Sequence, residues 1–242
     1  MNVSELLVRY LRALGVRHVF GYPGDPTVEL LEACRRENLD FVLGRREGTA
    51  GLMAEAAGML TGLPGVCVST LGPGSTNLVN AVANAWLDRV PMLAISGQIE
   101  SKREPYFTHQ VVDQERLFAP VCKWATTIQP HTAAIILRKA VRTAMAERPG
   151  PVHVTTHADV VGMEATDDAI VLPPLSIAAY PGMMSLRCLT LSAIPLFLTK
   201  GPIVSATNLP AAQAVITESP SVSITNKWLG ILLVSISPET MK

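Results

Sequence analysis

Glu47 is the first residue whose type and surroundings could do chemistry. It follows Arg45 and Arg46 and opens an Ala- and Gly-rich stretch that runs to Leu60. The free N–H groups of a helix N-terminus favour a carboxylate, so a plain helix-capping glutamate is the more frequent explanation for this position alone. The small residues that follow also let another surface approach the helix start closely. Glu47 is therefore a candidate functional residue.

A glycine-rich turn, Gly72-Pro73-Gly74-Ser75-Thr76-Asn77, follows the β-rich run at 66–70. Such a loop before a helix offers backbone N–H groups to an anion or to a flat polar ligand. Pro73 removes one of these donors, and the spacings of the dinucleotide-binding and Walker motifs are both missing. Taken alone, the string is more often an ordinary strand-to-helix turn.

The five histidines indicate no metal site. The only residues near metal-ligand spacing are His157 and Asp159, a weak pair, so ordinary surface or hydrogen-bonded histidines are expected. His109 and Gln110 lie in a polar stretch at 100–110 that is typical of a loop. The Gly-x-Ser-x-Gly motif of serine hydrolases does not occur in the sequence.

The positions of apolar residues predict strands alternating with helices. The expected strands lie at 16–22, 41–43, 66–70, 92–96, 123–128 and 152–154. The expected helices lie at 3–14, 26–36, 47–60, 75–87 and 132–147. Parallel strands need long, usually helical crossovers, so this order predicts a doubly wound α/β fold, with a mostly parallel sheet covered by helices on both faces. Ligands bind beyond the carboxyl ends of such strands, where the segments at 22–24, 45–47, 72–74 and 97–98 fall.

Charge and cysteine content favour an intracellular protein that acts on small molecules. Lys+Arg and Asp+Glu both number 20, so no global field favours nucleic acid or an anionic membrane. The four cysteines, at 34, 67, 122 and 188, lack C-x-x-C spacing and are expected to be free thiols. The N-terminus lacks the apolar block of a signal peptide, and the most apolar window, 186–199, is broken by Pro195. We expect a cytoplasmic protein without a membrane helix.

The composition changes near residue 173. Residues 173–242 hold four basic and two acidic side chains and eight of the 18 prolines. A surface so poor in charge is unusual for an independent soluble domain. The predicted organisation is therefore a first domain at 1–165, a linker at 166–185, and an incomplete or degenerate second domain at 186–242.

Several strings follow one another in a familiar order. They are Phe20–Gly24, Arg46-Glu47, Ser69–Gly74 with Asn77, Asp88–Gln98, and Gln110 with Asp113. Together they resemble the N-terminal, pyrimidine-binding domain of thiamine-diphosphate enzymes of the acetolactate synthase type. The similarity runs from residue 2 to about residue 162. Benzoylformate decarboxylase, oxalyl-CoA decarboxylase and sulfoacetaldehyde acetyltransferase share that domain.

The resemblance implies a role for each matching residue. The family's glutamate at the position of Glu47 hydrogen-bonds the pyrimidine ring, which stabilises the tautomer whose imine takes the proton from the thiazolium carbon. Gln110 matches a loop residue near the reacting centre, so Glu47 and Gln110 are the expected catalytic residues. The expected cofactor-binding residues are Tyr22, Pro23, Gly24, Glu47, Thr70, Gly74 and Asn77. No metal ligand is expected in this chain.

Two departures from the family pattern concern the substrate and the diphosphate. Arg46 stands where the family usually has His, and Gly48-Thr49-Ala50 replaces Gln-Gly-Ala, which leaves the substrate open. The family holds the diphosphate and its Mg²⁺ with a Gly-Asp-Gly motif, which does not occur in these 242 residues. Mg²⁺ would then be held by a domain absent from this chain, in a homodimer or a hetero-oligomer with a diphosphate-binding chain. Whether FAD also binds is left open.

The function that the resemblance implies is thiamine-diphosphate-dependent decarboxylation and carboligation of a 2-oxo acid. This chain would supply the pyrimidine-activating half of a lyase or transferase and would be inactive in isolation. The alternative is a non-catalytic module that binds thiamine diphosphate or dimerises, or an inactive fragment. Neither function involves nucleic acid or a membrane.

Overall fold

The computed structural model describes residues 1–166, 204–206 and 214–216. The chain divides into two units, Met1–Ile177 and Ala178–Lys242, which are described separately. In the second unit the described residues are the two short strands β7 (Val204–Ala206) and β8 (Ala214–Ile216), which pair antiparallel. The predicted linker and most of the predicted second domain lie outside the described residues, and the predicted domain boundaries stay predictions.

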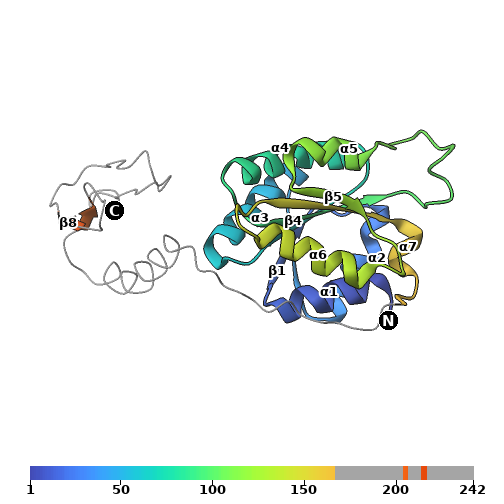
Figure 1. The fold of residues 1–242 in the computed structure, drawn as a ribbon, viewed down its shortest axis with the longest axis horizontal. Coiled ribbons are helices and arrows are strands. Elements are labelled where there is room, and N and C mark those ends of the chain that lie inside the picture. The colour runs from blue at the N-terminus through green and yellow to red at the C-terminus, as the bar shows by residue number, and fades with distance from the viewer. Residues whose placement is uncertain (167–203, 207–213, 217–242) are drawn as a thin grey trace, which may run out of the picture. The chain divides into compact units, whose positions relative to one another are not determined.

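The first unit alternates helices and strands along the chain (Figure 1). Its strands are β1 (His18–Gly21), β2 (Asp40–Leu43), β3 (Gly65–Ser69), β4 (Met92–Gln98), β5 (Trp124–Thr127) and β6 (Pro151–His157). Its helices are α1 (Val3–Leu14), α2 (Val28–Arg36), α3 (Glu47–Thr61), α4 (Pro73–Leu87), α5 (Gln114–Phe118), α6 (Ala133–Met145) and α7 (Ala158–Gly162). Two 3₁₀ turns, η1 (Asp25–Thr27) and η2 (Ala119–Val121), complete the unit.

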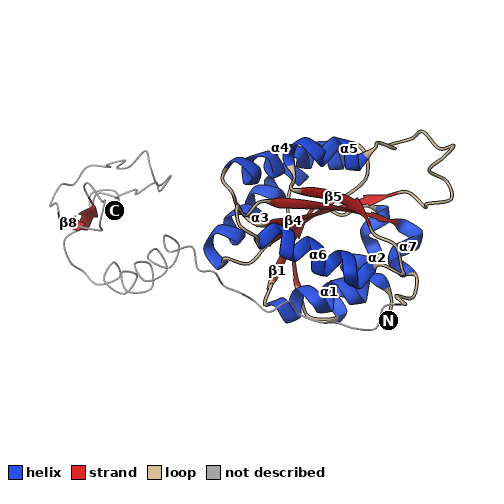
Figure 2. Ribbon diagram, in the orientation of Figure 1, coloured by secondary structure: helices blue, strands red, loops and turns tan. Residues whose placement is uncertain are grey.

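The six strands form one sheet in the order β2-β1-β3-β4-β6-β5, and every pairing is parallel (Figure 2). The predicted α/β fold with a mostly parallel sheet is therefore confirmed. Because all strands run the same way, their carboxyl ends lie along one edge of the sheet. The residues that follow β2, β1 and β3 are thus neighbours in space.

Helices cover both faces of the sheet. On one face α1 packs against α2, α6 and α7, and on the other α3 packs against α4, which packs against α5. Neighbouring residues of β3 show the alternation that a strand requires, because Val66 and Val68 join the core beneath α1 and α6, whereas Cys67 joins the core beneath α4. The first α/β unit therefore has an apolar core on each side of the sheet.

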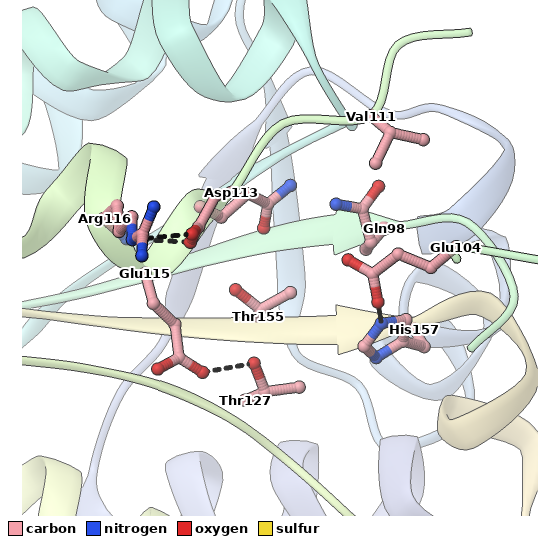
Figure 3. A pocket seen from close by; sticks show the side chains of 10 residues that line it. Gln98, Glu104, Val111, Asp113, Glu115, Arg116, Thr127, Thr155 and His157 are labelled. Carbon is pink, nitrogen blue, oxygen red and sulfur yellow. Dashed lines mark hydrogen bonds and ion pairs between the residues drawn. The ribbon is translucent and has the colours of Figure 1, made fainter. Parts of the chain in front are cut away.

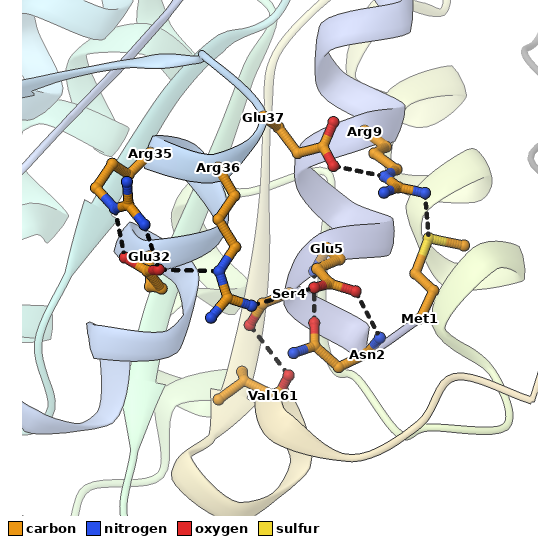
Figure 4. A network of polar contacts seen from close by, with 10 residues as sticks. All are labelled: Met1, Asn2, Ser4, Glu5, Arg9, Glu32, Arg35, Arg36, Glu37 and Val161. Atoms are coloured by element: carbon orange, nitrogen blue, oxygen red, sulfur yellow. Dashed lines mark hydrogen bonds and ion pairs between the residues drawn. The ribbon is translucent and has the colours of Figure 1, made fainter.

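The first helix begins at a capping box. Asn2 Oδ1 accepts a hydrogen bond of 2.8 Å from the backbone N–H of Glu5, and the Asn2 N–H donates to Glu5 Oε2. Gly15 ends the helix with a φ of 100°, a conformation that favours glycine. Ion pairs at the surface join this helix to α2, between Arg9 and Glu37 and between Arg36 and Glu5 (Figure 4).

The predicted loop at 100–110 is confirmed as turns, but two short helices were not predicted. Helices α5 and α7 have five residues each, which is too short for a 3.6-residue period to become visible. Each directly borders the carboxyl-end edge of the sheet, and α5 ends the loop that follows β4.

The thiols expected to be free are free where the structure describes them. Cys34, Cys67 and Cys122 are buried and unpaired, and Cys188 lies outside the described residues. Within the described part of the chain, no helix is long and apolar enough to cross a membrane.

Candidate functional site

Three segments from the predicted site meet at the carboxyl-end edge. Tyr22–Gly24 follows β1, Glu47 begins α3 just after β2, and the 70–77 turn follows β3. Because β1 lies between β2 and β3 in the sheet, these segments are adjacent. The strand order, which the sequence does not reveal, is what brings them together.

Glu47 is held by an amide from the next helix. Glu47 is the first residue of α3 and is only 7% exposed. Asn77 Nδ2 donates a hydrogen bond of 2.7 Å to Glu47 Oε2. No hydrogen bond to Oε1 is found among the described residues, and this oxygen lies beside Gly74, where an added Cβ would sit 2.8 Å from it. The carboxyl group is thus fixed through one oxygen while the other remains available.

Thr70 packs between two glycines. A Cβ added to Gly24 would lie 2.0 Å from Thr70 Oγ1, and one added to Gly74 would lie 2.5 Å from Thr70 Cγ2. Real Cβ atoms do not approach so closely, so both positions require glycine because of the space and not because of the backbone angle. The structure therefore brings Gly24, Thr70, Gly74, Asn77 and Glu47 into one contiguous group.

The backbone of Gln110 packs against the same glycine-rich turn. A Cβ on Gly72 would lie 2.4 Å from the carbonyl oxygen of Gln110, and Gly72 has a φ of 53°. Gln110 itself has a φ of 59° and is exposed. The loop that carries Gln110 is therefore packed onto the glycine-rich turn. The role of its side chain stays a prediction.

Tyr22 and Pro23 are less tightly placed. The Tyr22 N–H donates to the carbonyl of Val68, which fixes the backbone after β1, but its side chain is 43% exposed. Pro23 is half-buried. Both residues lie at the expected edge of the sheet, and their predicted contacts with a cofactor stay predictions.

A buried polar chain behind the turn was not predicted. Ser69 Oγ lies 2.8 Å from Ser96 Oγ, which lies 2.9 Å from His153 Nε2. The His153 ring stacks on Phe118 with ring centroids 3.8 Å apart, and burial lowers the pKa of His153 to about 3. Ser69 pairs with Ser96 in the register of β3 and β4, so aligning the two strands would have revealed the first contact.

A cavity of about 490 Å³ lies at the ends of β4 and β6, apart from the Glu47 group (Figure 3). Gln98, Thr155 and His157 contribute to its wall together with Val111 and residues 113–116. His157 Nε2 lies 2.9 Å from Glu104 Oε2, so the imidazole is engaged by a carboxylate. In the described residues, no group of three His, Cys, Asp or Glu side chains could hold a metal ion.

Comparison with known proteins identifies the family of this domain. Residues 1–117 match the model described as "Thiamine pyrophosphate enzyme, N-terminal TPP binding domain". A probable acetolactate synthase large subunit of Methanocaldococcus jannaschii is 37% identical over 161 residues, which are 66% of this chain and 27% of that protein. The acetolactate synthase isozyme 3 large subunit of Escherichia coli is 35% identical over 163 residues, 66% of this chain and 28% of that protein.

A third relative is named for a different activity. A probable 2-ketoarginine decarboxylase of Pseudomonas aeruginosa is 34% identical over 172 residues, which are 69% of this chain and 31% of that protein. The chain thus spans less than a third of the length of the relatives that it matches. Its N-terminal domain belongs to the thiamine pyrophosphate enzymes, as a TPP-binding domain of the acetolactate synthase type.

Proposed function

We propose that residues 1–165 bind the aminopyrimidine of thiamine diphosphate, with Glu47 as the activating acid, in an enzyme that decarboxylates a 2-oxo acid and transfers the remaining fragment. The observation that carries the proposal is the pairing of Glu47 with Asn77 beside Gly74. A buried carboxyl group with one engaged and one available oxygen, at the carboxyl-end edge of a parallel sheet, is suited to a flat nitrogen heterocycle.

The residues present fit an aminopyrimidine. Glycine at positions 24 and 74 lets Thr70 and Glu47 lie closer to the backbone than a Cβ would allow. Through Oε1, Glu47 would share a proton with a ring nitrogen, while Asn77 holds Oε2 and so fixes the direction of the carboxyl plane. Tyr22 and Pro23 would flank the ring at the end of β1.

When bound, thiamine diphosphate supplies the electron sink for cleavage of the bond next to a 2-oxo group. This chain's part is to orient the ring and to hold a proton at Glu47 Oε1. The buried position, only 7% exposed, keeps water from competing for that oxygen. Gln110 would approach the substrate from the loop that packs on Gly72.

The complete activity requires more than this chain. We propose a homodimer, or a hetero-oligomer with a chain that holds the diphosphate and Mg²⁺. The Gly-Asp-Gly motif does not occur in these 242 residues, so a second copy of them would not supply it. The substrate is a small 2-oxo acid whose identity stays open, as does the binding of FAD. A cytoplasmic location is part of the same proposal.

The deciding experiment compares the effects of replacing two buried glutamates of α3, Glu47 and Glu55. Glu55 accepts hydrogen bonds of 2.8 and 2.9 Å from Asn84 Nδ2, so it repeats the Glu47–Asn77 arrangement two turns further along the helix. Glu47→Gln should lower turnover of a 2-oxo acid by about 10²–10⁴-fold, the range for loss of a general acid or base. Glu55→Gln should leave it near the wild-type value.

Turnover is to be measured with thiamine diphosphate, Mg²⁺ and the diphosphate-binding chain, and binding by titration calorimetry. Equal, measurable turnover in Glu47→Gln and the wild type would refute the role of Glu47, whereas cofactor binding without turnover in either protein would leave only the non-catalytic binding module. Absence of binding in every combination would refute both. Full turnover by the chain alone would refute the need for a partner.

A further inference from the structure

The loop between β4 and α5, residues 99–113, has no buried residue. It extends away from the body of the first unit (green in Figure 1). Loops of this length are uncommon in compact domains and open easily when few buried contacts hold them. Its local turns, such as the hydrogen bond from Phe107 N–H to the Arg103 carbonyl, do not attach it to the sheet.

The outgoing limb of the loop is attached to the segment that follows β6. Asp159 accepts two hydrogen bonds from Ser101, one of 3.0 Å from its N–H and one of 2.6 Å from its hydroxyl. His157 Nε2 lies 2.9 Å from Glu104 Oε2 (Figure 3). A carboxylate only accepts, so the imidazole donates this bond. The ring cannot follow the loop outward, because His157 is 5% exposed and forms the end of β6.

The returning limb of the loop is attached to the proposed cofactor turn. Gln98 Nε2 donates to the carbonyl of Val112 at 3.1 Å, and the backbone of Gln110 packs on Gly72. Gln110 must hold a φ of 59°, which is unfavourable for a residue with a side chain and persists only where surrounding contacts maintain it. The position of Gln110 thus depends on how firmly the whole loop is held.

We infer that His157 and Asp159 form an anchor that holds the outgoing limb of loop 99–113 at the end of β6 and so keeps Gln110 on the turn at 72–77. They are positioning residues that act through the loop, and their part in catalysis rests on the proposed function. The pair explains why His157 and Asp159 stand two residues apart: the last residue of the strand and the second of α7 point their polar groups at the same loop. The spacing of His157 and Asp159, which in the sequence was a weak indication of a metal site, is explained by their contacts with the loop.

The anchor can be removed from either side. Asp159→Ala removes both acceptors of Ser101 from the domain side. Ser101→Ala combined with Glu104→Ala acts from the exposed loop: it removes the Ser101 hydroxyl and the Glu104 carboxylate, and leaves only the hydrogen bond from the backbone N–H of residue 101 to Asp159. In hydrogen–deuterium exchange followed by mass spectrometry, both variants should raise the exchange rate of the amides at 108–112 by about tenfold or more, because each lost hydrogen bond to a charged group is worth about that factor.

Amides 108–112 are the discriminating readout, since a merely local role would raise exchange only at 100–106. Asp159→Asn should restore the wild-type rate, because its amide can still accept from the Ser101 N–H and donate to the hydroxyl. Asp40→Ala, which removes an exposed carboxylate on the far edge strand β2, should change nothing in the loop.

Unchanged exchange at 108–112 in the loop-side double variant would overturn the inference. So would increased exchange confined to 100–106. This readout needs neither cofactor nor turnover, so a failure of the proposed function would leave it intact. Where turnover is obtained, the double variant should lower kcat/KM without weakening thiamine diphosphate binding.

Discussion

Asn77 Nδ2 donates a 2.7 Å hydrogen bond to Glu47 Oε2 and so joins the N-terminal part of α4 to the first residue of α3. The two residues are 30 positions apart, and both helices begin at the carboxyl-end edge of the sheet. The bond sets the direction in which the second carboxyl oxygen points. It is the contact on which the geometry of the proposed pyrimidine site depends.

Asn77→Ala should weaken thiamine diphosphate binding by about tenfold, because a hydrogen bond to a charged group contributes about 1.5–3 kcal/mol. Titration calorimetry measures the dissociation constant. Asn84→Ala is the matched control, since it removes the equivalent bond to Glu55 between the same two helices. Equal losses of affinity in both variants would show that helix packing is responsible and that Glu47 is not specially involved.

Gly74→Ala should displace the Glu47 carboxyl group. The new Cβ would lie 2.5 Å from Thr70 Cγ2 and 2.8 Å from Glu47 Oε1, so the turn must shift. We expect a loss of about 1–3 kcal/mol in the free energy of unfolding, as for other overpacked sites, together with loss of cofactor binding. Gly162→Ala, where no atom lies within 4 Å of the added Cβ, should stay within about 0.5 kcal/mol of the wild type in urea unfolding. Normal cofactor affinity in Gly74→Ala would contradict the site.

His153 should make the stability of the domain depend on pH. Burial lowers the pKa of His153 from 6.5 to about 3, so between these values the unfolded chain binds a proton that the native one does not. Stability is therefore complete above about pH 6.5 and falls as the pH drops, with a slope that approaches about 1.4 kcal/mol per pH unit. Urea unfolding from pH 7.5 to 4.5 measures the slope, and His153→Leu should remove this part of it. An unchanged slope in that variant would show that other groups cause the acid sensitivity.

The three buried thiols should resist alkylation in the native protein. Burial raises the pKa of Cys34 to about 11, that of Cys122 to about 12, and that of Cys67 still further. Because the thiolate is the reactive form, iodoacetamide at pH 8 should label these positions only after unfolding. Peptide mass spectrometry in a Cys188→Ser background measures the labelling. Rapid native labelling of Cys67, which is fully buried, would contradict the packing of β3.

The sequence predicted the longer helices and the strands well, but it did not predict the short helices or the contacts of the loops between them. Helix α6 carries a clear apolar stripe, and the glycine–proline punctuation marks most strand ends, so type and order were predictable. Helices α5 and α7 contain too few residues to show the 3.6-residue apolar repeat of a helix, and residues that hold a loop in place produce no recognisable pattern in the sequence. The contacts of His157 and Asp159 with the loop are therefore visible only in the tertiary structure.

The sequence by itself determined the alternation of strands and helices and the ordered motifs around Glu47, because apolar periodicity and turn formation depend on residues that are close together in the chain. The tertiary structure decided which of these motifs meet. The strand order places the end of β1 between those of β2 and β3, and packing alone brings Asn77 to Glu47 and His153 to Ser96. Contacts between residues far apart in the chain depend on how whole layers pack, and no local pattern encodes that.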